Sequence, residues 1–281
     1  MTAAFIVYVL KVNSFIKLKR VVLYSVFFQL CFWVVTFLSP ELKMLLYKLI
    51  GATDSPNINE QNLLVRGFGL SSEINFITPF MMVFLVFYFS RSIIYRVTVV
   101  LTQIINSNMA IISSIIMLFY AKWNLIYKIF SMVLVSSLIL VLSEKFLPRF
   151  YSEFVDNGGM RTISILLENH LIFLNKGFFE VIFGTSRAIF HGADVFTSDI
   201  GWIITYNYGG VFLILLIVSY FSVLIYKASN NLIDFILLAA FFVILNTKGL
   251  VFGVNGFVFL LHVLMFVRHF GENKLNGKVN V

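Results

Sequence analysis

Near-continuous apolar runs fill most of this chain, and they constrain its fold more than any other feature. The run at 201–226 alone exceeds the roughly 20 residues that a helix needs to cross a bilayer. We expect membrane-spanning helices at 21–39, 76–90, 97–105, 109–121, 129–142, 201–226, 232–245 and 256–267. Asn106, Ser107 and Asn108 separate two of these runs and predict a tight turn near one membrane surface.

The composition excludes a soluble domain. Only 12% of the residues are charged, 60% are hydrophobic, and the mean hydropathy is +0.95. Soluble domains carry about 25% charged residues, and a chain this apolar would expose large apolar surfaces in water. We therefore expect an all-α protein, a polytopic transmembrane helical bundle that forms one integral membrane domain over residues 1–281.

Basic residues collect at every second boundary between the apolar runs. The formal charge of +8 is also typical of nucleic-acid-binding proteins, but no basic cluster here is interleaved with soluble structure. Excess Lys and Arg on cytoplasmic loops explains the charge and sets the orientation. The basic positions are Lys11, Lys17, Lys19, Arg20, Arg91, Arg96, Lys122, Lys128, Lys227, Arg268, Lys274 and Lys278. The pattern predicts a cytoplasmic C-terminus, membrane lipids as partners and no nucleic acid.

Two longer segments lie on the opposite, external side, at about 40–75 and 144–200. Long loops held on a rigid bundle tend to carry function. The second segment contains 161–174 (RTISILLENHLIFL), in which apolar residues recur with helical periodicity. We expect an amphipathic helix there, at the membrane surface or against the bundle. His170 falls in its apolar stripe, where a packing role outweighs a catalytic one.

Side chains suited to phosphate chemistry lie in these external segments. Arginine matches phosphate bidentately, which makes Arg66, Arg161 and Arg187 candidates, although for any one of them alone snorkelling to lipid headgroups is the better explanation. Asp199 and Ser198 precede the 201–226 run and have an obvious role as its N-cap. We expect no metal site and no cofactor, since no metal-ligand spacing or phosphate-binding glycine loop is found in the sequence.

Three patches resemble a known family. They are 66–75 (RGFGLSSEIN), 199–202 (DIGW) followed by 206–210 (YNYGG), and 246–249 (NTKG). With the long external loop, they make the chain similar to the bacterial O-antigen and capsular polysaccharide polymerases (Wzy-type), of the O-antigen polymerase/ligase superfamily. Members of that family have further spans before the segment matching Lys11–Arg20, so the resemblance implies that N-terminal spans are lacking here.

The resemblance implies an enzyme of the bacterial inner membrane. It would transfer a growing glycan from undecaprenyl diphosphate to a lipid-linked repeat unit on the periplasmic face, with a chain-length regulator protein as a further partner. Arginines would neutralise the leaving diphosphate, and a carboxylate or histidine would take the proton from the acceptor hydroxyl. The candidates for the diphosphate are Arg161, Arg187 and Arg66, and those for the base are Asp199, Asp194, Glu73 and His191.

Other functions remain open. An O-antigen ligase uses the same donor, but ligases of this superfamily usually carry a histidine near the position of Asp199, which favours a polymerase. A flippase or other transporter would place charges within its spans or break its helices at the midplane. The predicted spans are almost free of charge. An inactive fragment is the third alternative.

Overall fold

The computed structural model is helical wherever it forms regular structure. It describes residues 15–49, 67, 77–120, 126, 128–130, 133, 137, 151, 164, 168–186, 198, 200–247 and 256–276. No β-strand occurs among these residues, which confirms the all-α class. The chain divides into two compact units, 16–156 and 1–15 with 157–281, and each is described by itself.

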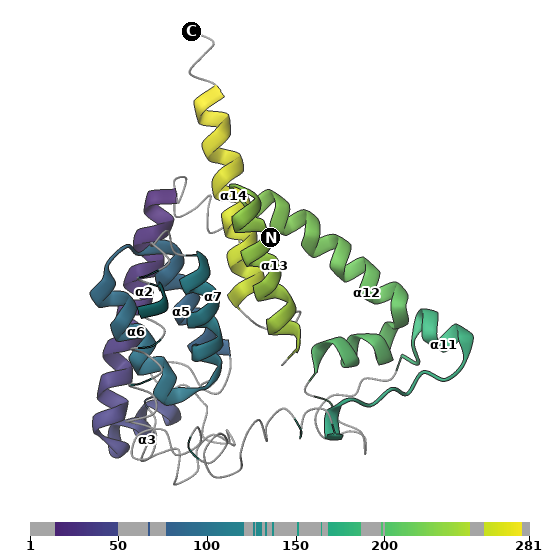
Figure 1. Ribbon diagram of the computed structural model, residues 1–281, viewed down its shortest axis with the longest axis horizontal. Helices are drawn as coiled ribbons and strands as arrows, with labels where there is room; N and C mark the ends of the chain where they lie inside the picture. The colour runs from purple at the N-terminus through teal and green to yellow at the C-terminus, as the bar shows by residue number, and fades with distance from the viewer. Residues whose placement is uncertain are drawn as a thin grey trace. The chain divides into compact units, whose positions relative to one another are not determined.

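The unit 16–156 contains five helices among its described residues. They are α2 (Phe15–Leu38), α3 (Pro40–Leu49), α5 (Ile77–Phe89), α6 (Ile93–Asn106) and α7 (Met109–Tyr120). Helix α5 packs against both α6 and α7, as Figure 1 shows. The Tyr95 hydroxyl of α6 donates to the Leu23 carbonyl of α2 at 2.8 Å, which ties these two helices together.

Four of the five predicted runs in this unit match described helices, and their largest differences are at the helix starts. The turn between α6 and α7 is confirmed, because Ser107 ends α6 and its carbonyl accepts from the Ala110 amide at 3.0 Å. Helix α6 starts at Ile93, four residues earlier than its run, because the Ser92 hydroxyl caps it. Helix α2 starts at Phe15 and includes Lys17, since basic side chains are good helix formers.

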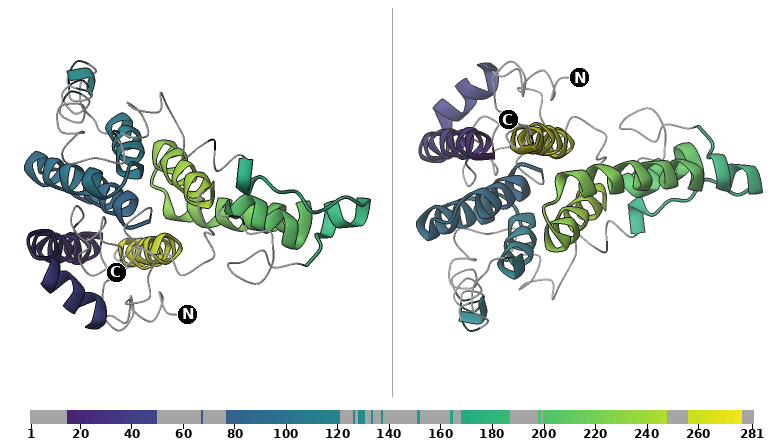
Figure 2. Two further views of the ribbon diagram at one scale, coloured as in Figure 1. Left: turned by 90° about the horizontal axis from the view of Figure 1, so that it is seen from below. Right: turned by 90° about the horizontal axis from the view of Figure 1, so that it is seen from above.

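The unit that ends the chain contains α11 (Phe178–Phe183), α12 (Gly201–Ala228), α13 (Leu232–Thr247) and α14 (Gly256–Asn276). Helix α12 packs against each of the other three. Figure 2 shows that α12 bends, and that α11 lies beside the bend, away from α13 and α14. Helix α11 therefore makes its contacts in this unit mainly with one part of α12.

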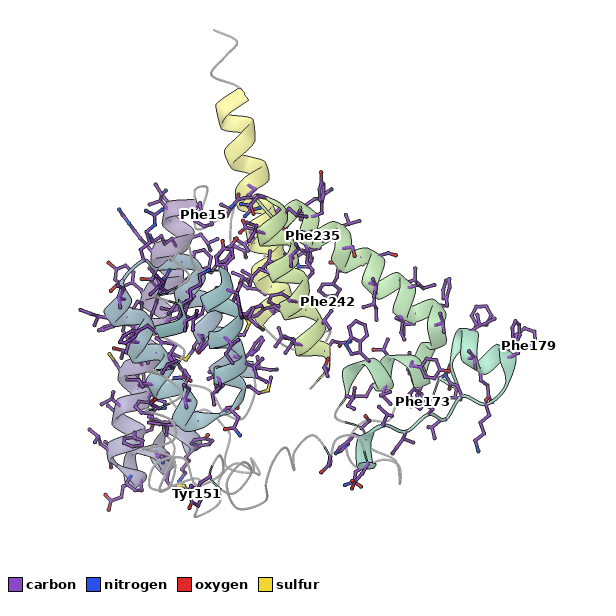
Figure 3. The ribbon with its side chains drawn as sticks, in the orientation of Figure 1. Phe15, Tyr151, Phe173, Phe179, Phe235 and Phe242 are labelled. Atoms are coloured by element: carbon purple, nitrogen blue, oxygen red, sulfur yellow. The ribbon has the colours of Figure 1, made fainter. Side chains whose placement is uncertain are left out.

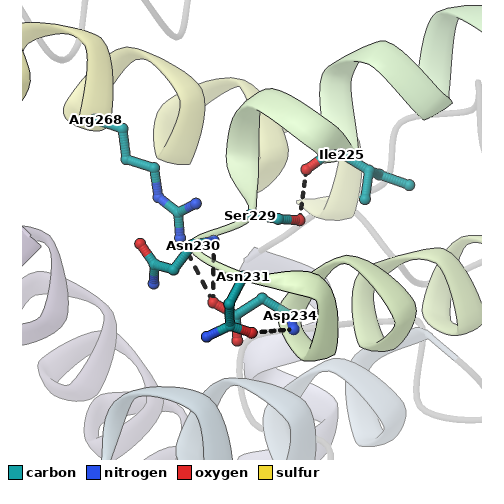
Figure 4. A network of polar contacts seen from close by, with 6 residues as sticks. All are labelled: Ile225, Ser229, Asn230, Asn231, Asp234 and Arg268. Atoms are coloured by element: carbon teal, nitrogen blue, oxygen red, sulfur yellow. Dashed lines mark hydrogen bonds and ion pairs between the residues drawn. The ribbon is translucent and has the colours of Figure 1, made fainter.

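A polar network joins the α12–α13 turn to α14 (Figure 4). The Asp234 carboxylate lies 4.0 Å from the Arg268 guanidinium and accepts from the Asn230 amide at 3.2 Å. The Asn231 side chain in turn accepts from the Asp234 amide at 2.9 Å and so caps α13. Because Asp234 is 2% exposed, this charge depends on these contacts.

The long helices keep most of their apolar side chains on the surface, as the sticks in Figure 3 illustrate. Helices α2 and α12 are long and apolar enough to cross a membrane, and only 22% and 28% of their apolar windows are buried. A core helix of a soluble protein would be mostly buried. Both helices are thus compatible with insertion into a membrane.

The other predicted spans form shorter apolar helices, namely α5, α6, α7, α13 and the apolar part of α14. The run 129–142 lies almost wholly outside the described residues, with isolated helical positions at 129, 130, 133 and 137. In the external segment 40–75, the structure describes α3 and Gly67. The single membrane domain and its periplasmic loops stay predictions.

Candidate functional site

Helix α12 is broken at Gly210, inside the run that the sequence predicts as one continuous span. Gly210 has φ 63° and ψ −163°, a backbone conformation that side chains strongly disfavour. A Cβ atom there would also lie 2.3 Å from the Ile182 carbonyl oxygen. The change in direction separates 201–209 from the part that runs on to Ala228 (Figure 1).

The chain that follows α11 packs against this break and donates hydrogen bonds to two carbonyl groups of α12. The Thr185 amide and hydroxyl both donate to the Asn207 carbonyl at 2.9 Å, and the Ser186 amide donates to the Tyr208 carbonyl at 3.0 Å. In an unbroken helix these carbonyls would accept from amides four residues later. The break is therefore stabilised by a segment more than twenty residues earlier in the sequence.

The Asn207 side chain holds a second stretch of backbone. It is fully buried, its Nδ2 donates to the Ile172 carbonyl at 2.6 Å, and its Oδ1 accepts from the Leu174 amide at 2.9 Å. Both of its polar atoms are thus used on the edge of one extended segment. Residues 171–186 consequently form a hairpin that carries α11, with both ends of the hairpin fixed to α12 (Figure 2).

The predicted amphipathic helix 161–174 is wrong at its C-terminal end. Ser164 and 168–170 are helical, but 171–176 are not. Asn207 provides the physical reason, because it binds the Ile172 carbonyl and the Leu174 amide that a helix would have used internally. A tertiary contact here overrides the local periodicity.

Asn175 leaves one buried acceptor atom without a partner beside the break. Its Nδ2 donates to the Tyr206 carbonyl at 2.8 Å, which fixes the orientation of the amide, since a carbonyl can only accept. Its Oδ1 has no hydrogen-bond partner in the described part of the chain, and the residue is 7% exposed. An unsatisfied buried acceptor costs about 1–3 kcal/mol.

An aromatic pair is connected to Asn175. It consists of Phe173, two residues earlier in the chain, and Tyr206, whose carbonyl accepts from Asn175 Nδ2. The Phe173 ring meets the Tyr206 ring edge to face, with centroids 5.6 Å apart. Phe173 is 54% exposed, so this group combines an exposed aromatic ring with a buried, unpaired amide oxygen.

The predicted cap of α12 is in the wrong place. The N-cap residue is Ile200, without a side-chain cap. The Ser198 hydroxyl accepts from the Ile200 amide at 3.1 Å and donates to the His170 carbonyl at 2.8 Å. It thereby joins the start of α12 to the end of the short helical stretch 168–170. Trp202 donates from Nε1 to the Val243 carbonyl at 3.3 Å, a contact with α13 that the sequence did not indicate.

The sequence-predicted site residues all lie outside the described residues: Asp199, Asp194, Glu73, His191, Arg161, Arg187 and Arg66. Their roles stay predictions. The structure does describe positions next to three of them in the chain, Ser186, Ser198 and Gly67. The Gly67 carbonyl accepts from Asn106 Nδ2 at 2.8 Å, and the Asn106 Oδ1 accepts from Trp33 Nε1 at 3.2 Å. That cluster belongs to the unit 16–156.

The sequence contained a signal for the break that its apolar run obscured. Asn207 and the pair Gly209–Gly210 interrupt an otherwise apolar stretch, and such residues inside a helix often mark kinks or close backbone approach. Comparison of the chain with protein-family models, curated proteins and solved structures finds no match. The family resemblance therefore rests on the three sequence patches.

Proposed function

We propose that the chain is a multi-pass enzyme of the bacterial inner membrane that polymerises a surface polysaccharide from lipid-diphosphate-linked glycan. One observation carries the proposal. The patch 206–210, which resembles the motif of the polymerases, forms a helix break to which both ends of the hairpin 171–186 are bound. A motif that anchors a long loop to a span is suited to building a site at the membrane surface.

The position of the break supports an interfacial site. The part of α12 after Gly210 has roughly 18 residues and is about 27 Å long at 1.5 Å per residue. That length nearly matches a hydrocarbon core of about 30 Å. The break thus lies at the end of a span, where the diphosphate and first sugars of a lipid-linked glycan would be.

The group around Asn175 suits a glycan. The exposed face of Phe173 offers an apolar surface for sugar C–H groups, and a sugar hydroxyl that displaced the groups covering Asn175 Oδ1 would satisfy this buried acceptor. Arg187 follows Ser186 directly in the chain, and Asp199 stands between Ser198 and Ile200. Two of the predicted site residues are therefore next to residues that contact the α12 break or its start.

The proposed reaction needs a base and a stabilised leaving group. The acceptor hydroxyl oxygen attacks the anomeric carbon of the donor glycan, and the bond from that carbon to the diphosphate oxygen breaks. The hydroxyl proton passes to Asp199 or Asp194, with Glu73 and His191 as alternatives. Undecaprenyl diphosphate leaves with its negative charge balanced by Arg161, Arg187 and Arg66. The scheme requires no cofactor.

A transporter of lipid-linked glycan is the second candidate, because broken helices are a feature of transporters and α12 is broken. Transporters place such breaks near the bilayer midplane. The length of α12 beyond Gly210 argues for a break near the surface instead. The ligase reaction shares the proposed donor and is separated from polymerisation only by its product.

The test is gel analysis of surface glycans in a host deleted for this gene and complemented with wild type, Arg161→Ala or Arg91→Ala, the last an exposed arginine at a predicted cytoplasmic boundary. For a polymerase we expect the deletion to leave lipid A-core with a single repeat unit. Wild type and the control Arg91→Ala should restore the ladder, and Arg161→Ala should not. Core without any repeat, with lipid-linked polymer accumulating, would identify a ligase. Single lipid-linked repeats retained on the cytoplasmic face would identify a transporter.

A further inference from the structure

Helix α11 carries a cluster of exposed aromatic side chains, which we call the α11 wedge: Phe178, Phe179 and Phe183. They are 75%, 75% and 55% exposed. A surface in water rarely presents three neighbouring phenylalanines in one short helix. We therefore expect the wedge to contact an apolar environment.

The only acidic side chain of the hairpin 171–186 is directed at the start of its own helix. Glu180 Oε2 accepts from the Lys176 amide at 2.9 Å and the Gly177 amide at 3.1 Å. The helix dipole favours a negative charge at that end. Glu180 thus satisfies amides that an apolar environment would leave unpaired.

Other backbone groups of the hairpin are also paired within the protein. The Val181 amide donates to the Gly177 carbonyl at 2.9 Å and the Gly184 amide to the Glu180 carbonyl at 2.7 Å. Beyond α11, the amides of Thr185 and Ser186 bind α12. Such pairing is what chain segments need if they enter lipid, where water cannot replace a missing partner.

The wedge continues an apolar surface of α12. The Phe183 ring lies 5.9 Å from that of Phe212, centroid to centroid. Phe212 is 51% exposed, and Leu215 and Leu216, which follow it on α12, are also exposed. These residues belong to the helix that is long and apolar enough to span a membrane. The apolar surface along α12 therefore continues into the phenylalanines of α11, whose one charged side chain, Glu180, accepts from the amides at the start of its own helix.

From this geometry we infer that the α11 wedge inserts into the bilayer interface at the Gly210 end of the 211–228 part of α12. The partner is the lipid itself: phenylalanine rings enter the boundary between headgroups and acyl chains, while exposed Lys176 reaches the phosphates. The inference rests on the proposal that α12 spans the membrane and is independent of the polymerase activity. The wedge would hold the hairpin, and with it Asn175, at the surface of the membrane.

The test places a fluorophore at single cysteines in the full chain. Cys31 is the sole cysteine and is exposed, so Cys31→Ser gives a background for Phe179→Cys, Leu215→Cys and Asn230→Cys. Each variant is labelled with an environment-sensitive dye in vesicles of phosphatidylethanolamine and phosphatidylglycerol. Quenching is measured with iodide in water, with lipids spin-labelled near the headgroup and with lipids spin-labelled deep in the chain.

We expect the dye at position 179 to be quenched at least twofold more by the shallow spin label than by the deep one, and little by iodide. The dye at 215 should respond to lipid-borne quenchers, and the dye at 230, in the α12–α13 turn, to iodide. Suppose instead that iodide quenches the dye at 179 as strongly as the dye at 230, while lipid-borne quenchers still quench the dye at 215. The wedge then faces water and the inference is wrong.

Two further outcomes are distinguishable. Protection of 179 from all three quenchers, with cross-linking between Phe179→Cys chains, would assign the wedge to contact with a second copy and overturn the inference. Strong iodide quenching at 215 would instead overturn the proposal that α12 spans the membrane. The polymerase proposal is tested separately, by the glycan ladder.

Discussion

Thr185 donates two hydrogen bonds to the Asn207 carbonyl oxygen, one from its amide and one from its hydroxyl, each at 2.9 Å. This pair explains how α12 can be broken inside an apolar run. The break removes acceptors from their usual helical partners, and an unpaired carbonyl away from water costs free energy. The hairpin 171–186 supplies the replacement donors. The break and the hairpin consequently form one cooperative element.

The first prediction concerns Gly210. We expect Gly210→Ala to lower the melting temperature of the purified protein and to make the hairpin 171–186 sensitive to protease. The new Cβ would meet the Ile182 carbonyl oxygen, and a backbone at φ 63° and ψ −163°, a region used almost only by glycine, costs about 1–3 kcal/mol for alanine. Gly256→Ala is the matched control, because nothing lies within 4 Å of its Cβ position. Equal melting temperatures for the two variants would contradict the described break.

The second prediction concerns the amide of Asn207. Asn207→Leu leaves the Ile172 carbonyl and the Leu174 amide without their partner, at a cost of about 1–3 kcal/mol for each. We expect the Leu174 amide to exchange with deuterium at least tenfold faster, as measured by mass spectrometry of peptides that cover 171–176. Asn207→Asp should give an intermediate rate, because its carboxylate still accepts from Leu174. Unchanged exchange in the leucine variant would show that the side chain does not hold the segment.

The third prediction separates binding from stability at Asn175. Asn175→Leu leaves the Tyr206 carbonyl without this donor, at a cost of about 1–3 kcal/mol, and also removes an unpaired acceptor of similar cost. We therefore expect the melting temperature to stay close to that of wild type while the surface glycans become shorter. Asn230→Leu, at an exposed position, is the control for expression. Full-length glycans from the Asn175 variant would exclude this residue from glycan binding.

The fourth prediction is a pH dependence caused by Lys43 in α3, outside the candidate spans. Its side chain is fully buried, and burial lowers its pKa from 10.5 to about 8. Between these values the unfolded chain holds the proton and the folded chain does not, so the free energy of unfolding rises with pH from about 8 to about 10.5. The rise is at most roughly 3 kcal/mol, at about 1.4 kcal/mol per pKa unit.

Melting temperatures measured across that pH range test the effect of Lys43. The wild-type curve should climb, and the curve of Lys43→Met should be flatter by the contribution of this one group. Lys48→Met, in the same helix but at a position that is not buried, should follow the wild type. A parallel climb in the Lys43 variant would assign the pH dependence to other groups.

The sequence predicted the elements whose structure depends on local pattern. Helices α5 and α7 start and end within a residue of their apolar runs, because near-uniform hydrophobicity between polar turns leaves little choice of boundary. The turn at Asn106–Asn108 followed from three polar residues between such runs. The all-α class and the apolar surfaces of the helices could thus be predicted from composition and periodicity alone.

The predictions that were wrong concern structure that depends on contacts between residues distant in the sequence. The helical period of 161–174 continued through Leu174, but Asn207, 33 residues away, holds that end of the stretch extended. The break in α12 looked like part of a span because Gly209 and Gly210 are compatible with apolar surroundings. The candidate site around Asn175 and Tyr206 arises from these same contacts. No periodicity within either segment contains that information.

Gly184 and Gly210 are both approached by backbone rather than by side chains. A Cβ atom on Gly184 would lie 2.3 Å from the Tyr208 carbonyl oxygen, just as one on Gly210 would meet that of Ile182. Backbone atoms are the same whatever the sequence, so no second mutation can make room by shrinking a neighbour. Elsewhere in these elements a second mutation can compensate for a larger side chain, but at these two positions none can. A descendant chain either keeps both glycines or rebuilds the whole hairpin.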